Sequence, residues 1–171
     1  HLEARKRIGF QVIIFLIVHR HYEEVANQLS LEGLTPPPPM TNTVLVVVGD
    51  LHRGVVKAIQ YAQTLSPNAK AVFVETDTDR THRLEEKWGK WGMGVPLIVL
   101  TSPYRSLMGP LVEYIDHLQQ NENHVVTIVI PEFIPVRWWQ LGLHNQTALL
   151  IKGAMLFRKN VIVTDVPYHL T

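Results

Sequence analysis

The sequence contains no cysteine, which excludes disulfide bonds and thiolate metal sites. Charge is also scarce, since Asp, Glu, Lys and Arg make up 18% of the 171 residues and the net charge is +1. A chain with so little net charge has no strong field to attract nucleic acid, and we expect no nucleic-acid partner. The nine histidines are scattered and form no recognisable metal-ligand spacing, so no metal site is expected.

Long hydrophobic runs are scarce as well. Residues 8–18 are almost wholly apolar and follow a basic cluster at residues 5–7, but a membrane-spanning helix needs about 20 apolar residues. The run is compatible with the end of a membrane helix, with an ordinary amphipathic helix, or with a signal-peptide core that lacks a cleavage site. Residues 22–31 then show helical periodicity, so an N-terminal helix is predicted within residues 1–34.

Four consecutive prolines, at residues 36–39, separate this helix from the rest of the chain. Such a run adopts an extended polyproline conformation and acts as a semi-rigid spacer. We therefore predict a linker at residues 35–42 and a separate domain at residues 43–171.

Strand and helix patterns alternate throughout this domain. β-Branched apolar runs predict buried strands, and amphipathic segments between them predict helices. This alternation predicts a five-stranded parallel α/β sheet with helices on both faces. The predicted strands are residues 43–48, 70–74, 95–100, 124–130 and 160–164, and the predicted helices are residues 53–65, 78–91, 107–119 and 140–157.

Three segments carry a resemblance to a known family. They are residues 19–29 (HRHYEEVANQL), 43–54 (TVLVVVGDLHRG) and 161–168 (VIVTDVPY). Together with the proline spacer, they resemble the universal-stress-protein-like cytoplasmic tail of amino-acid-permease-like transporters, and most closely that of KimA-type potassium importers. The resemblance implies a non-enzymatic regulatory domain on the cytoplasmic face of the membrane. It also implies a homodimer attached to the membrane domain of the same transporter, with cyclic di-AMP as an inhibitory ligand and no cofactor.

One departure from that fold concerns the nucleotide. ATP-binding stress proteins place a glycine-rich phosphate loop after the fourth strand, whereas residues 131–139 here read PEFIPVRWW. This bulky segment offers few backbone N–H groups to a phosphate, so ATP or AMP ranks behind cyclic di-AMP. A domain that only dimerises, without any nucleotide, is a further alternative.

The candidate ligand-binding residues follow the predicted strands, because parallel sheets bind ligands beyond the carboxyl ends of their strands. Asp50, His52 and Arg53 follow the first strand, where the guanidinium suits a phosphate and the imidazole suits a base or a phosphate. The alternative is that Asp50 caps the helix and Arg53 is only solvated.

The other candidates come from later loops. They are Thr76 after the second strand, Ser102, Tyr104 and Arg105 after the third strand, and Arg137 after the fourth. An aromatic ring can stack on adenine and a guanidinium can bind phosphate, although the third loop also reads as a proline-stiffened helix start. Residue types alone do not make a catalytic triad of Asp50, His52 and Ser102, so no enzyme is expected.

Overall fold

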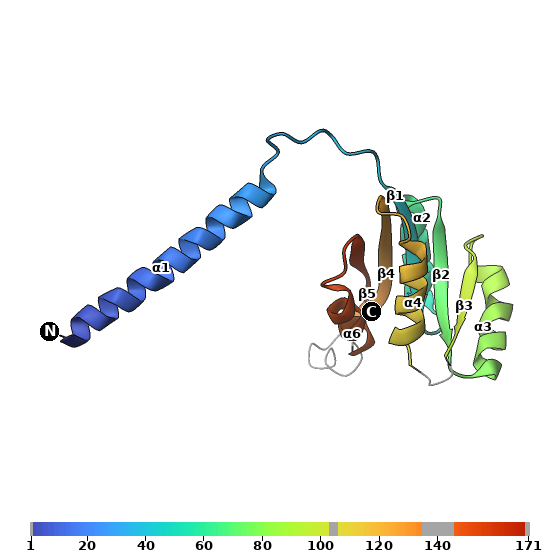
Figure 1. The fold of residues 1–171 in the computed structure, drawn as a ribbon. Coiled ribbons are helices and arrows are strands. Elements are labelled where there is room, and N and C mark those ends of the chain that lie inside the picture. Colours follow the sequence, from blue (N-terminus) through green and yellow to red (C-terminus); the bar gives the residue numbers. More distant parts are fainter. Residues whose placement is uncertain (1, 103–105, 135–145, 170–171) are drawn as a thin grey trace. The chain divides into compact units, whose positions relative to one another are not determined.

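The computed structural model describes residues 2–102, 106–134 and 146–169. Its contacts divide the chain into two compact units, His1–Pro37 and Pro38–Thr171. The first contains one helix and the second contains the whole sheet (Figure 1). The dividing point lies within the four prolines.

Helix α1 (Leu2–Leu29) joins the apolar run and the amphipathic segment into one continuous helix. From Phe10 to Val18 its apolar side chains are exposed, and two i,i+4 ion pairs follow, His19–Glu23 and Arg20–Glu24. Among the described residues, no helix has both the length and the apolar character that crossing a membrane requires. After α1, residues 34–40 form neither helix nor strand.

The second unit confirms the predicted fold, a five-stranded parallel sheet with helices on both faces (Figure 1). The strand order is β3-β2-β1-β4-β5, so the chain builds the sheet outward from β1 in one direction and then returns to build it in the other. All four strand pairs are parallel. The strands are β1 (Thr41–Val48), β2 (Ala69–Glu75), β3 (Leu97–Thr101), β4 (His124–Ile134) and β5 (Val161–His169).

Each face of the sheet carries its own hydrophobic core. Helices α2 (Arg53–Leu65) and α3 (Thr78–Trp91) pack on one face, and α4 (Met108–Leu118) and α6 (Gln146–Met155) pack on the other. Alternate residues of β1 enter the two cores, with Val46 in the first and Leu45 in the second, because successive strand side chains point to opposite faces. This two-sided burial explains why β1 reads as a continuous apolar run.

The end of α3 is tightly packed against β3. The indole of Trp88 donates from Nε1 to the carbonyl of Val95 at 2.8 Å and is buried. Gly92 lies directly against this ring, where a Cβ would come within 2.4 Å of Nε1. A glycine is therefore needed here for space, since its φ of −74° is accessible to any residue.

The fourth strand is longer than the sequence predicts. Pro131 was expected to end it, yet β4 continues to Ile134 and pairs with β5 along its whole extension. The pairing of β4 with β1 stops at Val129, so Pro131 has a strand neighbour on one side only and its missing N–H costs no bond to β1. The last strand is also longer than predicted, because it pairs with this extension of β4, and it reaches His169 instead of residue 164.

Candidate functional site

The strand order has a topological switch point between β1 and β4. The chain leaves β1 toward β2 on one side, while β4 lies on the other side, so the loops that follow these two strands diverge. In open parallel sheets this switch point is where ligands bind, beyond the carboxyl ends of the strands.

A cavity of about 610 Å³ lies at this position. Its walls are mostly apolar and come from the strand ends, from α6 and from the residue before α4, while its polar lining comes from the loops after β1 and β2, from β4, and from one residue each of α3 and α6. The apolar wall consists of Val47, Val48, Phe73, Val74, Leu107, Ile130, Pro131, Ala148 and Ile151, and the remaining lining residues are Gly49, Asp50, His52, Thr76, Arg80, Glu132 and Thr147. An apolar pocket with a few polar groups is typical of a small-molecule site.

His52 begins α2 and lines the cavity. Its Nδ1 accepts a hydrogen bond from the backbone N–H of Gly54 at 3.2 Å, so His52 caps the helix, and not Asp50 as the alternative interpretation had it. Partial burial of the ring lowers the pKa of His52 below its ordinary value, and the carboxylate of Asp50 opposes this effect. The neutral ring keeps Nδ1 as an acceptor, while Asp50 accepts from the N–H of Leu51 at 2.7 Å.

The structure brings together three of the predicted site residues, since Asp50, His52 and Thr76 all line the cavity. Arg53 is exposed and is not among the lining residues. Ser102 is also absent from the lining, because its hydroxyl closes its own loop by accepting from the N–H of Ser106 at 2.8 Å and donating to the Ser106 carbonyl at 2.9 Å. The three remaining candidates, Tyr104, Arg105 and Arg137, lie outside the described residues.

The sequence reasoning missed Arg80, which lines the cavity from the first turn of α3. Its Nη2 donates to the carbonyl of Gly49 at 2.7 Å, which ties α3 to the loop after β1. The sequence feature that could have identified Arg80 is its place as a cation in the first turn of the helix that follows β2. The strand order places that turn beside the end of β1, and this adjacency is not written in the local sequence.

Glu132 was also missed as a lining residue, because the segment around it was expected to be a loop. It lies on the extension of β4, close to the charge of Lys152 on α6. Lys152 Nζ forms an ion pair with Asp165 Oδ2 of β5 at 2.6 Å, and this hydrogen bond, together with the charges of Asp165 and Glu132, outweighs burial and raises the pKa of Lys152. The cation therefore offsets part of the negative charge at this wall of the cavity.

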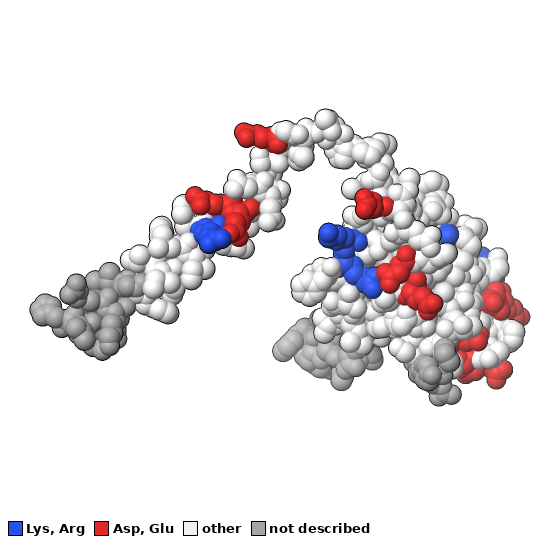
Figure 2. Space-filling view, viewed as in Figure 1, with Lys and Arg blue, Asp and Glu red and all other residues white. Residues whose placement is uncertain are grey.

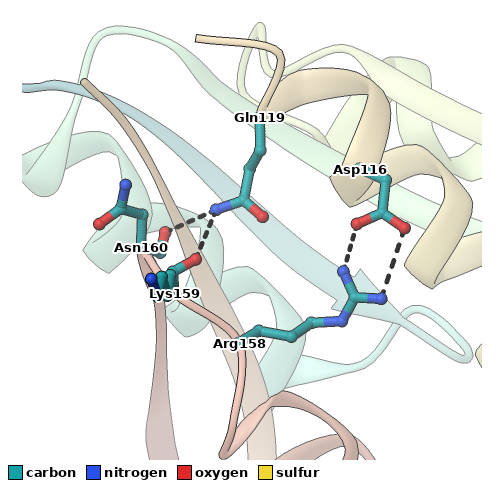
Figure 3. A network of polar contacts seen from close by, with 5 residues as sticks. All are labelled: Asp116, Gln119, Arg158, Lys159 and Asn160. Carbon is teal, nitrogen blue, oxygen red and sulfur yellow. Dashed lines mark hydrogen bonds and ion pairs between the residues drawn. The ribbon is translucent and has the colours of Figure 1, made fainter. Parts of the chain in front are cut away.

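A second hollow, also of about 610 Å³, lies near the amino ends of β4 and β5. Asp116 of α4 forms an ion pair with Arg158, and the amide of Gln119 donates to the carbonyls of Lys159 and Asn160 at 3.0 Å each (Figure 3). These contacts attach the end of α4 to the turn before β5. Since its polar groups are engaged with one another, this hollow reads as a structural junction.

Neither a metal site nor a single sign of charge distinguishes the described residues on the face drawn in Figure 2. No cluster of three or more potential metal ligands occurs among the described residues. On the face of the sheet unit that α4 covers, acidic and basic side chains lie next to each other (Figure 2). The cavity is thus the part of the described structure best suited to a ligand.

Comparison with known proteins gives two consistent matches. The family of KimA potassium transporter C-terminal domains matches residues 40–168. The potassium transporter KimA of Bacillus subtilis (strain 168) is 32% identical over 161 residues, covering 92% of this chain. The chain spans 26% of the length of that relative.

Proposed function

Because the chain belongs to the family of KimA potassium transporter C-terminal domains, we propose that it regulates a potassium transporter from the cytoplasmic face of the membrane. Cyclic di-AMP is the proposed ligand, bound across a homodimer, and its binding inhibits transport through the attached membrane domain. The observation that carries this proposal is the cavity at the carboxyl ends of β1 and β4.

The size and lining of the cavity support a nucleobase as occupant. Its volume of about 610 Å³ falls within the range of roughly 300–1,000 Å³ that is usual for small-molecule sites. The apolar wall that includes Val47 and Ile130 suits an adenine ring. The carboxylates of Asp50 and Glu132 and the hydroxyl of Thr76 are hydrogen-bond acceptors for its exocyclic amine.

The pairing of β4 with β5 supports a cyclic dinucleotide over ATP. A phosphate loop needs backbone N–H groups that point toward the ligand. Here the segment from Pro131 to Ile134 is a strand paired with β5, and Glu132 adds a negative charge to the cavity wall. ATP carries several negative charges, whereas each phosphodiester of cyclic di-AMP carries one.

An apolar surface next to the sheet edge supports the homodimer. Leu149 and Leu150 are exposed on α6, away from Ala148 and Ile151, which pack on the sheet, and Leu156 and Phe157 are exposed just after the helix. Strand β5 is the neighbouring edge of the sheet, and edge strands can pair with another chain. A second copy of this chain is the occupant we propose, because a two-fold ligand matches two identical half-sites.

Inhibition then follows from a difference in affinity. The ligand favours the arrangement of the two subunits in which both half-sites face it, and this bias can be no larger than its differential affinity for the two arrangements. A transporter whose active state requires another arrangement loses activity as the ligand saturates.

Calorimetric titration with cyclic di-AMP tests the binding. We expect a dissociation constant at or below tens of micromolar, about −6 to −7 kcal/mol, and absence of binding in that range would refute the proposal. Gly49→Leu should abolish binding, since Gly49 lines the cavity and has open space around its Cβ position. Gly89→Leu on α3 is the matched control, with equally open space but no place in the cavity, and should bind normally.

A test of the proposed inhibition requires the full-length transporter. Potassium uptake by proteoliposomes containing the full-length protein should slow when cyclic di-AMP is present on the side of this domain, and Gly49→Leu should remove the effect. If cyclic di-AMP does not change potassium uptake by the wild type, the inhibitory role is contradicted, while the proposed binding is unaffected by that result.

The apolar surface on α6 favours one other function, a dimerisation module that binds no nucleotide. That alternative predicts a dimer whose stability is unchanged by cyclic di-AMP, ATP and AMP. Mass spectrometry of the denatured protein separates these cases, because a tightly bound nucleotide co-purifies with its protein.

A further inference from the structure

The cavity has one cationic side chain among its described lining residues, and that side chain is Arg80. The same residue also lines two smaller hollows beside the cavity, one with Thr76, Asp77 and Thr78 and the other with Asp50, Arg83, Leu84 and Lys87. Arg80 therefore lies at the centre of a continuous polar border formed by the start of α3.

The guanidinium of Arg80 is already oriented by the backbone. Its Nη2 donates to the carbonyl of Gly49 at 2.7 Å, which holds the group over the end of β1. A guanidinium carries five N–H donors, so most of its donors remain available to a ligand. Within the described part of the chain no carboxylate forms an ion pair with Arg80, although Asp50 and Asp77 line the neighbouring hollows.

Two further cations follow Arg80 on the same side of α3. Arg83 and Lys87 lie three and seven residues later, spacings that repeat one face of a helix. They line the hollow of about 130 Å³ that Arg80 shares. Neither has an acidic partner among the described ion pairs, whereas His82, on another side of the helix, pairs with Glu85 at 3.6 Å.

We propose that α3 supplies the phosphate-binding cations of this site, with Arg80 in contact with a phosphodiester and Arg83 and Lys87 adding positive potential beside it. This inference rests on the proposed function, and it replaces Arg53, which the sequence favoured but which is not part of the cavity lining. Arginine suits the role because its planar fork matches the oxygens of a phosphate.

The charge balance also selects the kind of phosphate. One guanidinium faces one half-site, and one phosphodiester of a cyclic dinucleotide brings a single negative charge to it. The carboxylates of Asp50 and Glu132 line the same cavity, so the additional charges of a triphosphate meet repulsion. The site therefore favours cyclic di-AMP over ATP, and the discrimination comes from the balance of Arg80 against these two carboxylates, of which Glu132 is partly offset by Lys152.

Two substitutions of Arg80 separate its charge from its contact with Gly49. Arg80→Gln keeps an N–H donor for the Gly49 carbonyl but removes the charge, and Arg80→Lys keeps the charge but removes the fork. In calorimetric titrations with cyclic di-AMP, we expect Arg80→Gln to weaken binding about 10- to 100-fold, because a hydrogen-bonded charge is lost, and Arg80→Lys to weaken it less. Arg53→Ala is the control and should leave binding unchanged within about twofold, as expected for an exposed charge outside the cavity.

The double variant Arg83→Gln with Lys87→Gln tests the surrounding potential. We expect it to weaken binding by a few fold at low salt and to reduce the salt dependence of binding, because these cations act through screened electrostatics. Thermal melts of all variants check that the fold is retained.

The outcomes distinguish this inference from the proposed function. If the wild type binds cyclic di-AMP and Arg80→Gln binds equally well, or if Arg53→Ala causes the larger loss, the assignment of α3 is wrong and the proposed function stands. If the wild type binds no cyclic di-AMP, both are wrong.

Discussion

The apolar surface beside the sheet edge leads to a quantitative prediction. Phe157 is 90% exposed and Leu149 is 72% exposed, although both are large apolar residues. If a second copy of the chain covers this surface, Phe157→Ser should convert the dimer to a monomer at concentrations where the wild type is dimeric.

The size of the effect follows from the number of side chains buried. Burying one phenylalanine side chain contributes about 1.5–3 kcal/mol. A two-fold interface contains Phe157 twice, so the substitution should cost about 3–6 kcal/mol of association free energy. Since about 1.4 kcal/mol corresponds to a factor of ten, the dissociation constant of the dimer should rise by roughly two to four powers of ten.

Sedimentation equilibrium over a wide range of protein concentrations measures this constant. Tyr61→Ser is the matched control, because Tyr61 is also an exposed aromatic residue but lies on α2, which packs on the other face of the sheet. Equal dimer constants for the wild type and Phe157→Ser would refute the reasoning, and so would an equal loss in Tyr61→Ser. A wild type that stays monomeric at all concentrations would remove the two-fold site altogether.

Two further predictions concern stability. Because the pKa of His52 is lower in the folded chain than the ordinary value near 6.5, the unfolded chain binds the extra proton first as the pH falls, so the contribution of His52 is fully present above about pH 6.5 and is lost below it. Urea unfolding at about pH 7.5 and about pH 5.5 should therefore show a larger loss of stability in the wild type than in His52→Asn, whose amide still caps α2, and equal losses would contradict the shift. Gly92→Ala should destabilise the fold by about 1–3 kcal/mol, because the added methyl group meets the Trp88 ring. Gly89→Ala, in open space on α3, should instead be neutral or stabilising in the same thermal melts, and equal behaviour of the two variants would exclude the steric cause.

Most of the sheet was predictable because its signals are local. The bounds of α2 and α3 agree with the periodicity of residues 53–65 and 78–91. The central strand β1 left a continuous β-branched apolar run, since both of its faces are buried. The largest errors lie at the ends of β4 and β5, which are predicted to stop at residues 130 and 164. Pro131 was read as the end of β4, although β4 has only one neighbour there, and β5 extends alongside it. Whether a strand can continue through a proline depends here on the strand order, and no local sequence pattern contains the strand order.

The candidate site was predictable in position but not in all of its members. The rule of the switch point pointed to the loop after β1, and of the residues it suggested, Asp50, His52 and Thr76 line the cavity. Arg53 was favoured because a guanidinium at the start of the helix after β1 suits a phosphate, but Arg53 is not among the residues that line the cavity. Arg80 is distant in sequence and reaches the site because β2 lies beside β1, so only the assembled sheet identifies it.

The four prolines between α1 and β1 determine how a signal from the site can travel. A glycine-rich tether of that length would bend under any small displacement and would transmit only the loss of freedom of its ends. Four prolines resist compression and bending over about 12 Å, at about 3.1 Å per residue. Under the proposed function, movement of the sheet unit would therefore reach the preceding helix as a push or a pull with a direction. Replacing the prolines with glycine and serine should then reduce the proposed inhibition of transport while leaving ligand binding unchanged.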